Sequence, residues 1–235
     1  MAFSPELPDW KQEAIQTFQM GTYTKIFLQF NETFWDPDHE YFLYASPTTR
    51  GYYPIWQSLS TEGFLPGSNI IFVTVTGDES YRIEAQTDEE TKAEALEVLR
   101  EMFPNVTVPD PIAFTYPRWS LEPWAYGSYS NWPIGTTLER HQNLRANVER
   151  LYFAGEHTSP QYFGFLHGSW FEGREVGERI AGLLGKECLN RVGDAVYCGS
   201  HQRYEDLKGT TEEEEYEERN GWDVNTFIEP PPEEE

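Results

Sequence analysis

The sequence predicts an α/β or α+β fold, in which strands dominate the first half of the chain and a long helix follows in the second. Two runs rich in β-branched and aromatic residues, Tyr23–Phe30 and Asn69–Thr76, indicate strands. A glycine-punctuated pattern over Gly164–Leu184 indicates the helix. With 235 residues, of which 38% are hydrophobic, the chain can bury a core in one domain or in two small ones.

The predicted elements follow one another along the chain with turn residues between them. A short helix is expected near Lys11–Gln19. Strands are expected at Tyr23–Phe30, Tyr41–Ala45, Gly51–Leu59, Asn69–Thr76 and Ile112–Tyr116. Pro54 suggests that the third of these is an edge strand, because proline cannot donate to a ladder. A helix over Asp88–Met102 has acidic residues in its first turn and is stopped by Pro104.

The net charge of −23 argues against nucleic acid and anionic membranes as partners, because both are polyanions. The last 24 residues hold 11 of the acidic side chains against Arg219 alone. Most of Arg203–Glu235 is therefore expected to be disordered, with Trp222–Ile228 as a segment that could dock. The start, Met1–Pro5, does not resemble a signal peptide, and no run is apolar enough to span a bilayer. The compartment stays open, with the cytoplasm as the default.

The two cysteines, Cys188 and Cys198, fit no zinc pattern, and no metal site is expected. A disulfide between them and two unrelated thiols are both compatible with the spacing. Sequons at Asn31 and Asn105 are short motifs that arise by chance as well as by selection.

The segment from Leu151 to Leu184 has the organisation of a cofactor-binding motif. An apolar run, Leu151–Ala154, predicts a buried strand that ends in Gly155–Glu156 and leads into the closing helix. Such glycines let the backbone approach a ligand, the carboxylate can accept hydrogen bonds from ligand hydroxyls, and the helix N-terminus favours negative charge. His157 and His167 are interpreted as structural rather than as acid–base groups.

Lys25 lies inside the otherwise apolar strand Tyr23–Phe30, and the spacing alone leaves two interpretations open. An edge strand would turn the lysine to water. An inward lysine would need a partner, or burial would lower its pKa.

Three blocks of the sequence resemble the flavin-containing amine oxidases, and the polyamine oxidases among them. They are YTKIFLQF at Tyr23–Phe30, PRW followed by GSYSNWP at Pro117–Trp119 and Gly127–Pro133, and FAGEHTS at Phe153–Ser159. The resemblance runs from about Phe3 to Gly185. It implies FAD as the cofactor, a polyamine or other amine as the substrate, and oxidation of a C–N bond with O2 reduced to H2O2.

The resemblance also implies roles for individual residues. Lys25 would reach flavin N5 through a water molecule, and Tyr23 would line the substrate tunnel. Tyr129 and Phe165 would clamp the amine between two rings, and the start of the closing helix would face the flavin N1–C2=O2 edge. The cofactor-binding residues would be Trp119, Trp132, Gly155, Glu156, Gly164 and Phe165.

The sequence departs from the family in one respect, because it does not contain the GxGxxG motif that binds the FAD pyrophosphate. The resemblance therefore implies a C-terminal portion: residues 1–21 as a remnant of the FAD-domain connection, 22–118 as part of a mixed-sheet substrate-binding domain, 119–187 as the C-terminal strand–helix part of an incomplete Rossmann-like FAD domain, and 188–235 as an acidic tail. Its missing partner would be the N-terminal FAD-binding half, and without it the chain is expected to be inactive. The alternative is a truncated, non-catalytic remnant that acts as an interaction module. An unrelated aromatic-rich β domain that binds sugars is a third option.

Overall fold

The computed structural model describes residues 2–185, and the expectations for the acidic tail, for Trp222–Ile228 and for Cys188 and Cys198 lie outside them. The chain forms two compact units. The sheet unit is Met20–Ser128, and the helical unit contains residues 2–19 and 129–185. The division into domains predicted from the resemblance stays a prediction. Residues 119–128, which that division gives to the FAD domain, belong to the sheet unit.

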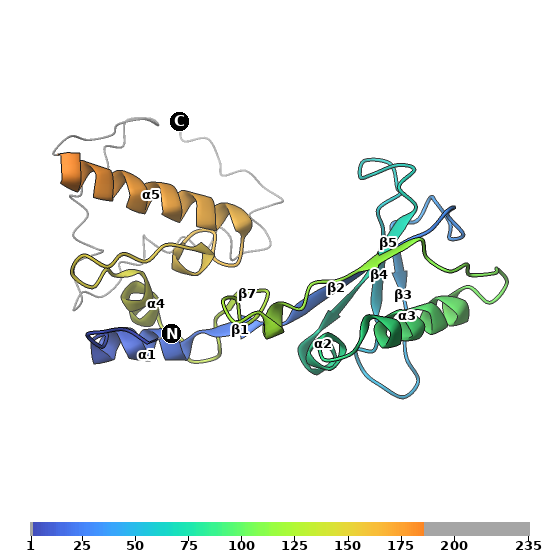
Figure 1. Cartoon of the computed structure of the whole chain (residues 1–235), viewed down its shortest axis with the longest axis horizontal. Coiled ribbons are helices and arrows are strands. Elements are labelled where there is room, and N and C mark those ends of the chain that lie inside the picture. The colour runs from blue at the N-terminus through green and yellow to red at the C-terminus, as the bar shows by residue number, and fades with distance from the viewer. Residues whose placement is uncertain (1, 186–235) are drawn as a thin grey trace, which may run out of the picture. The chain divides into compact units, whose positions relative to one another are not determined.

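The sheet unit is built on a five-stranded sheet with two helices on one face (Figure 1). The strands, in spatial order, are β3 (Tyr41–Leu43), β4 (Ile55–Ser58), β5 (Ile70–Thr76), β2 (Tyr23–Gln29) and β6 (Ala113–Thr115). All four pairs of neighbours are antiparallel, so the expected mixed sheet is an antiparallel one. The helices are α2 (Gly77–Glu84) and α3 (Asp88–Met102).

The two faces of the sheet differ in what they bury. Along β2 burial alternates residue by residue, with Thr24, Ile26 and Leu28 fully buried and the residues between them half-buried. Ile26 and Leu28 belong to one hydrophobic cluster with residues of α2 and α3, such as Ile83 and Leu99. Burying side chains of this size contributes roughly 1.5–3 kcal/mol each. The opposite face of β2 carries Tyr23, Lys25 and Phe27.

Helix α3 has the predicted bounds, and its start is fixed by a capping box. The Thr87 hydroxyl accepts from the Glu90 amide, while the Glu90 carboxylate accepts from the Thr87 amide. These hydrogen bonds to Thr87 lower the pKa of Glu90. The fold class and the strands of this unit are confirmed to within a few residues.

One sequence-based expectation for the sheet unit is wrong, and one of its helices was not expected. Helix α2 begins at Gly77, directly after β5, and Gly77 has a positive φ of 62°. The strand after Pro54 lies between two neighbours, and Pro54 stands just before its first residue, where no ladder donor is needed. β2 lies between β5 and β6 in the sheet, but β6 pairs only with Phe27–Gln29, so at Lys25 the strand is paired on the β5 side.

The helical unit packs α1 (Asp9–Thr17) against α4 (Leu138–Arg145), and α5 (Leu166–Gly185) against a short 3-10 turn, η2 (Glu156–Thr158). Lys11 of α1 is fully buried and donates to the carbonyls of Asn143, Leu144 and Ala146 at 2.9, 2.5 and 2.7 Å. These carbonyls lie at the C-terminal end of α4, where a cation is favoured. Its ammonium also lies 3.6 Å from the centroid of the Phe153 ring. Lys11 of α1 therefore caps the C-terminal end of α4.

The buried strand expected at Leu151–Ala154 is not formed. Leu151 makes one isolated bridge with Val148 and is 40% exposed, and residues 152–154 are irregular. Within residues 2–185 no strand runs beside this segment, and a strand needs a neighbour to satisfy its backbone groups. The closing helix begins at Leu166, two residues later than expected.

A separate two-stranded sheet pairs β1 (Gln19–Gly21) with β7 (Tyr129–Asn131). None of the helices in residues 2–185 combines the length and the hydropathy needed to cross a bilayer. The same residues hold no group of three or more His, Cys, Asp or Glu side chains that could ligate a metal ion together.

Candidate functional site

Lys25 stands on an aromatic platform on the open face of the sheet. Its Nζ atom lies 4.4 Å from the centroid of the Phe72 ring and 5.9 Å from that of Tyr23. Phe72 in turn packs against Phe27 at 5.1 Å between ring centroids. Ring faces attract a cation, so the platform holds the ammonium over the sheet. Within residues 2–185 no carboxylate lies at ion-pair distance from it.

Trp119 opens a 3-10 turn, η1 (Trp119–Leu121), and its ring is 36% exposed. Trp124 meets it edge-on at 5.8 Å between ring centroids. Arg118 anchors this turn by donating to the carbonyls of Glu84 and Gln86, each at 3.1 Å, where α2 ends. The Arg118 guanidinium also pairs with Asp88 at the start of α3. These contacts, between the end of α2 and the start of α3, thus fix Arg118, the residue that precedes Trp119.

Ser128 attaches the start of the GSYSNWP block to the strand of Lys25. Its hydroxyl accepts from the Tyr23 amide at 3.0 Å and donates to the Tyr23 carbonyl at 2.8 Å. Gly127 makes this approach feasible, since a Cβ there would lie 2.6 Å from the Cβ of Met20. These contacts set the position of Tyr23, the expected tunnel residue.

In the helical unit, Glu156 joins two loops. One carboxylate oxygen accepts from the Ser130 amide at 2.8 Å, and the other accepts from the Ser130 hydroxyl at 2.7 Å and the Gly164 amide at 2.8 Å. Gly164 has a φ of 80°, which favours glycine. A carboxylate has about four acceptor positions, and these three donors leave one of them unused.

Gly155 is required by the imidazole of His157. A Cβ at Gly155 would stand 2.5 Å from the His157 ring, so any other residue would displace it. The backbone of Gly155 also exchanges two hydrogen bonds with the Thr158 hydroxyl. In this unit, Gly155 therefore serves the packing of η2.

Burial lowers the pKa of two histidines of this unit. Desolvation lowers the pKa of His141 well below its ordinary value, and the nearby Arg145 charge lowers it further. Its Nε2 atom lies 2.8 Å from the His157 carbonyl. Burial also lowers the pKa of His157. These positions agree with the interpretation of His157 as structural, and His167 packs edge-on against Tyr162 at 4.6 Å.

The remaining candidates lie near these loops. Trp132 packs in an aromatic cluster with Phe18, His141 and Phe163, at centroid distances of 5.6, 5.0 and 5.4 Å. Tyr129 is 39% exposed on β7, and the half-buried Phe165 lies 5.2 Å from the His167 ring just before α5.

Within the sheet unit, the structure thus places Lys25, Tyr23 and Trp119. Within the helical unit it places the other candidates: Tyr129, Trp132, Gly155, Glu156, Gly164 and Phe165. Their roles toward a ligand stay predictions. The anchors that the sequence reasoning missed are Arg118, Ser128 and Ser130, which lie within or beside the quoted motifs.

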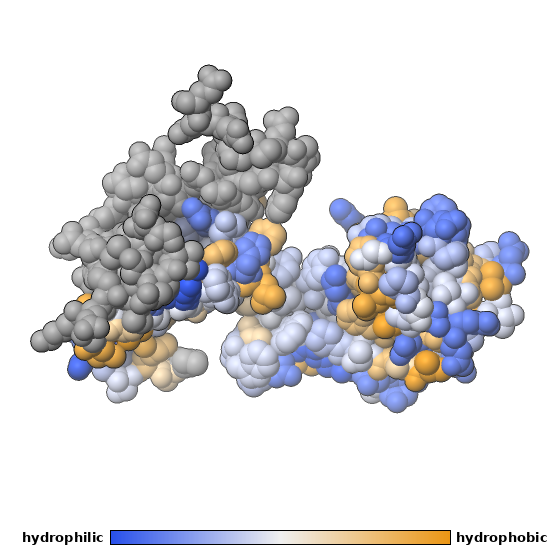
Figure 2. Space-filling view, turned by 90° about the horizontal axis from the view of Figure 1, so that it is seen from above, coloured by the Kyte–Doolittle hydropathy of each residue, from blue (hydrophilic) through white to orange (hydrophobic). Residues whose placement is uncertain are grey.

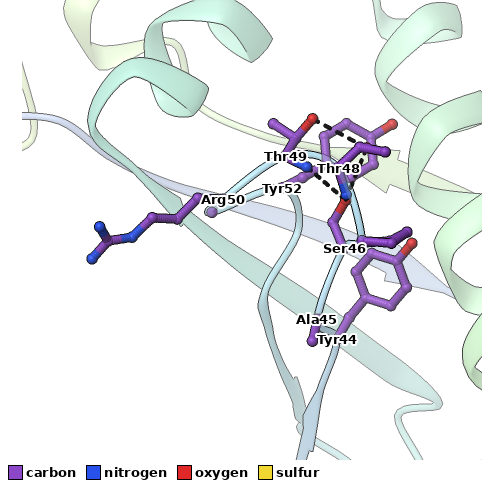
Figure 3. Close-up of a pocket in the computed structure, with 9 residues that line it drawn as sticks. Tyr44, Ala45, Ser46, Thr48, Thr49, Arg50 and Tyr52 are labelled. Atoms are coloured by element: carbon purple, nitrogen blue, oxygen red, sulfur yellow. Dashed lines mark hydrogen bonds between the residues drawn. The ribbon is translucent and has the colours of Figure 1, made fainter.

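A hollow of about 390 Å³ lies elsewhere, in the loop between β3 and β4 (Figure 3). It is lined by the consecutive residues Tyr44 to Tyr52, none of which is a candidate. The hydroxyl of Ser46 accepts from the amides of Thr48 and Thr49 at 3.4 and 3.2 Å, so the loop hydrogen-bonds mainly to itself.

The comparisons with known proteins agree with this arrangement. Residues 1–181 match the family model described as flavin containing amine oxidoreductase. The chain is 50% identical over 173 residues to polyamine oxidase 7 of Oryza sativa subsp. japonica, covering 73% of this chain and 36% of that protein. It is 48% identical to polyamine oxidase 1 of Zea mays, covering 79% and 37%. A possible lysine-specific histone demethylase 1 of Drosophila melanogaster is 34% identical, covering 76% and 21%.

Solved structures share the fold. Cyclohexylamine oxidase from Brevibacterium oxydans superposes with a TM-score of 0.62 at 24% identity, covering 78% of this chain and 40% of that one. A putrescine oxidase bound to putrescine gives 0.61 at 17% identity, covering 76% and 39%. This chain spans little more than a third of the length of the plant relatives. The matched family model covers most of it, so the chain belongs to the flavin-containing amine oxidoreductases, whose cofactor is FAD.

Proposed function

We propose that this chain supplies the lysine-bearing sheet and the C-terminal flavin-contacting loops of a polyamine oxidase. The observation that carries this proposal is the Lys25 ammonium on its aromatic platform. Its two most similar plant relatives above are polyamine oxidases. FAD, when bound, supplies the acceptor for a hydride from the carbon next to the amine and passes the electrons to O2, which becomes H2O2.

The residues of the chain fit a flavin in their donor chemistry. Lys25 is an ammonium held on an apolar face, suited to donate through a water to flavin N5. Trp119 offers a partly exposed indole, and Glu156 keeps one acceptor position beside the loop that precedes α5. Trp132, Gly155 and Gly164 would complete the cofactor-facing loops.

Tyr129 and Phe165 would orient the amine. Two ring faces can hold an aliphatic amine chain so that its reacting carbon faces the hydride acceptor, and Tyr23 would line its path. Water admitted after hydride loss would convert the imine to an aldehyde and an amine. The role of this chain in the reaction is positioning, with Lys25 as the one residue that would act at the reacting atoms.

This chain alone should not retain FAD, because its sequence has no GxGxxG motif for the pyrophosphate. The purified chain should show no flavin absorbance after incubation with FAD and gel filtration. Stoichiometric flavin in the protein peak would contradict this.

A chimera tests the catalytic proposal. Residues 1–181 would replace the matching segment of the rice polyamine oxidase, and H2O2 release would be followed with spermidine and spermine. An active chimera that loses about 10²-fold in kcat on Lys25→Met supports the role of Lys25. Lys92→Met, on α3 of the same unit, is the matched control. An inactive but FAD-loaded chimera, or a fully active Lys25→Met variant, would overturn the proposal.

A further inference from the structure

A buried carboxylate on the helix side of the sheet unit has no part in the proposed chemistry. Glu84 is the last residue of α2 and is 1% exposed. Its carboxylate accepts from the Thr24 hydroxyl at 2.7 Å, from the Ser120 amide at 2.8 Å, and from the Ser120 hydroxyl. Ser80 extends the network, since its hydroxyl lies 2.6 Å from that of Thr24. All three donors to Glu84 come from segments distant in the sequence.

The two residues that Glu84 contacts are the neighbours of two candidate residues. Thr24 precedes Lys25 on β2, and the alternation of a strand turns their side chains to opposite faces. Ser120 follows Trp119 in η1. One carboxylate therefore links the backbone that carries Lys25 to the backbone that carries Trp119.

Helix stability does not account for a glutamate at this position. The C-terminal end of a helix carries partial negative charge and favours cations. A buried carboxylate also loses its hydration, which its hydrogen bonds must offset. The Arg118 guanidinium meets the backbone carbonyl of Glu84 rather than its carboxylate within hydrogen-bond distance. What the carboxylate uniquely provides is a set of acceptors for both Thr24 and Ser120.

We infer that Glu84 is a positioning residue that fixes Trp119 relative to Lys25. This inference rests on the proposed roles of those two residues for its functional meaning, but its geometry can be tested without them. A carboxamide at position 84 keeps the shape of the side chain but replaces one acceptor oxygen with a donor NH2 group. The carboxamide therefore cannot accept from both Thr24 and Ser120.

The test labels the full chain with 5-fluorotryptophan and follows the ¹⁹F resonance of Trp119, assigned by its loss in Trp119→Phe. In Glu84→Gln the resonance should shift or broaden, and the Ser120 amide should exchange about tenfold faster. Ser120→Ala, which leaves the acid in place, should shift the same resonance.

Two controls separate positioning from general destabilisation. Glu89→Gln changes an exposed acid of α3, and Val98→Ala weakens the core of the same unit away from the network. Neither should move the Trp119 resonance. The inference is overturned if Glu84→Gln and Ser120→Ala leave that resonance unchanged, or if Val98→Ala moves it equally. Activity of the chimera reports separately on the proposed function.

Discussion

Replacing Lys11 with methionine removes a buried amino group while keeping most of the side-chain volume. Three carbonyls at the C-terminal end of α4 then lose their donor. Each unsatisfied buried acceptor costs about 1–3 kcal/mol, and partial relaxation toward water lowers the sum. The variant should therefore lose about 3–5 kcal/mol from the helical unit at neutral pH.

The pH dependence of this loss gives a sharper test. Burial lowers the pKa of Lys11 to about 7 in the folded chain, from 10.5. Between these values the unfolded chain binds a proton that the folded chain lacks, so the free energy of unfolding rises with pH across this window. The limiting slope is about 1.4 kcal/mol per pH unit. The parent should thus gain about 2 kcal/mol relative to Lys11→Met between pH 7.5 and 9.5.

Amide hydrogen exchange of α4, corrected for its intrinsic pH dependence, reports the opening free energy of this unit. Lys92→Met in the sheet unit is the control and should track the parent at every pH. Equal slopes for the parent and Lys11→Met would refute the reasoning. So would a parent that loses stability across the window, because that result would require a raised pKa for Lys11.

Three further predictions concern single residues. Thr87→Ala removes the hydroxyl that accepts from the Glu90 amide and should lower the stability of the sheet unit by about 1 kcal/mol in urea unfolding, whereas Thr87→Ser should not. Leu99→Ala empties a fully buried site and should cost about 2–5 kcal/mol in the same assay. His141→Gln should flatten the loss of stability of the helical unit as pH falls below 6.5, because burial lowers the pKa of His141 and the unfolded chain takes up the proton first. A parent whose exchange protection in α4 is equal at pH 7 and 5.5 would contradict this last expectation.

The strongly patterned elements were predictable from local sequence. Helix α3 combines acidic residues in its first turn, a periodic apolar face and a proline after its end, and these signals predicted the observed bounds. Strands β2 and β5 are continuous runs of β-branched and aromatic residues, and they pair over their full lengths. Helix α2 escaped prediction because Thr76–Gly77–Asp78 reads as a turn, and the same residues start a helix when tertiary contacts bury Ile83.

The surroundings of the candidate residues were less predictable than their positions. The motif around Lys25 predicted an important lysine, but only the structure shows that the strand pairs with β5 at Lys25 and with β6 from Phe27 onward. The strand expected at Leu151–Ala154 failed because an apolar run specifies burial and not its pairing partner. Arg118 was visible within the PRW motif, yet its contacts with the α2–α3 corner are far away in the sequence.

Several large apolar side chains remain exposed on the two folded units. Trp124 is 72% exposed in the sheet unit, and Leu166 and Trp170 of α5 are 89% and 59% exposed. Figure 2 shows hydrophobic residues in several separate groups on the face of the sheet unit in view. Single exposed apolar side chains are ordinary on protein surfaces, so they do not by themselves identify a partner.

The aromatic loop between Trp119 and Trp132 is held at both ends by the same kind of contact, in which a glutamate carboxylate accepts two hydrogen bonds from one serine. In the sheet unit, Glu84 accepts from the amide and the hydroxyl of Ser120. In the helical unit, Glu156 accepts from the amide and the hydroxyl of Ser130. A serine that donates through both its amide and its hydroxyl loses backbone and side-chain freedom together. Each glutamate therefore fixes the serine next to an aromatic candidate, Trp119 or Tyr129. If the proposed function holds, variants of the two glutamates should differ in kind: Glu84→Gln should lower kcat of the chimera through Trp119, and Glu156→Gln should also weaken FAD retention through its remaining acceptor position.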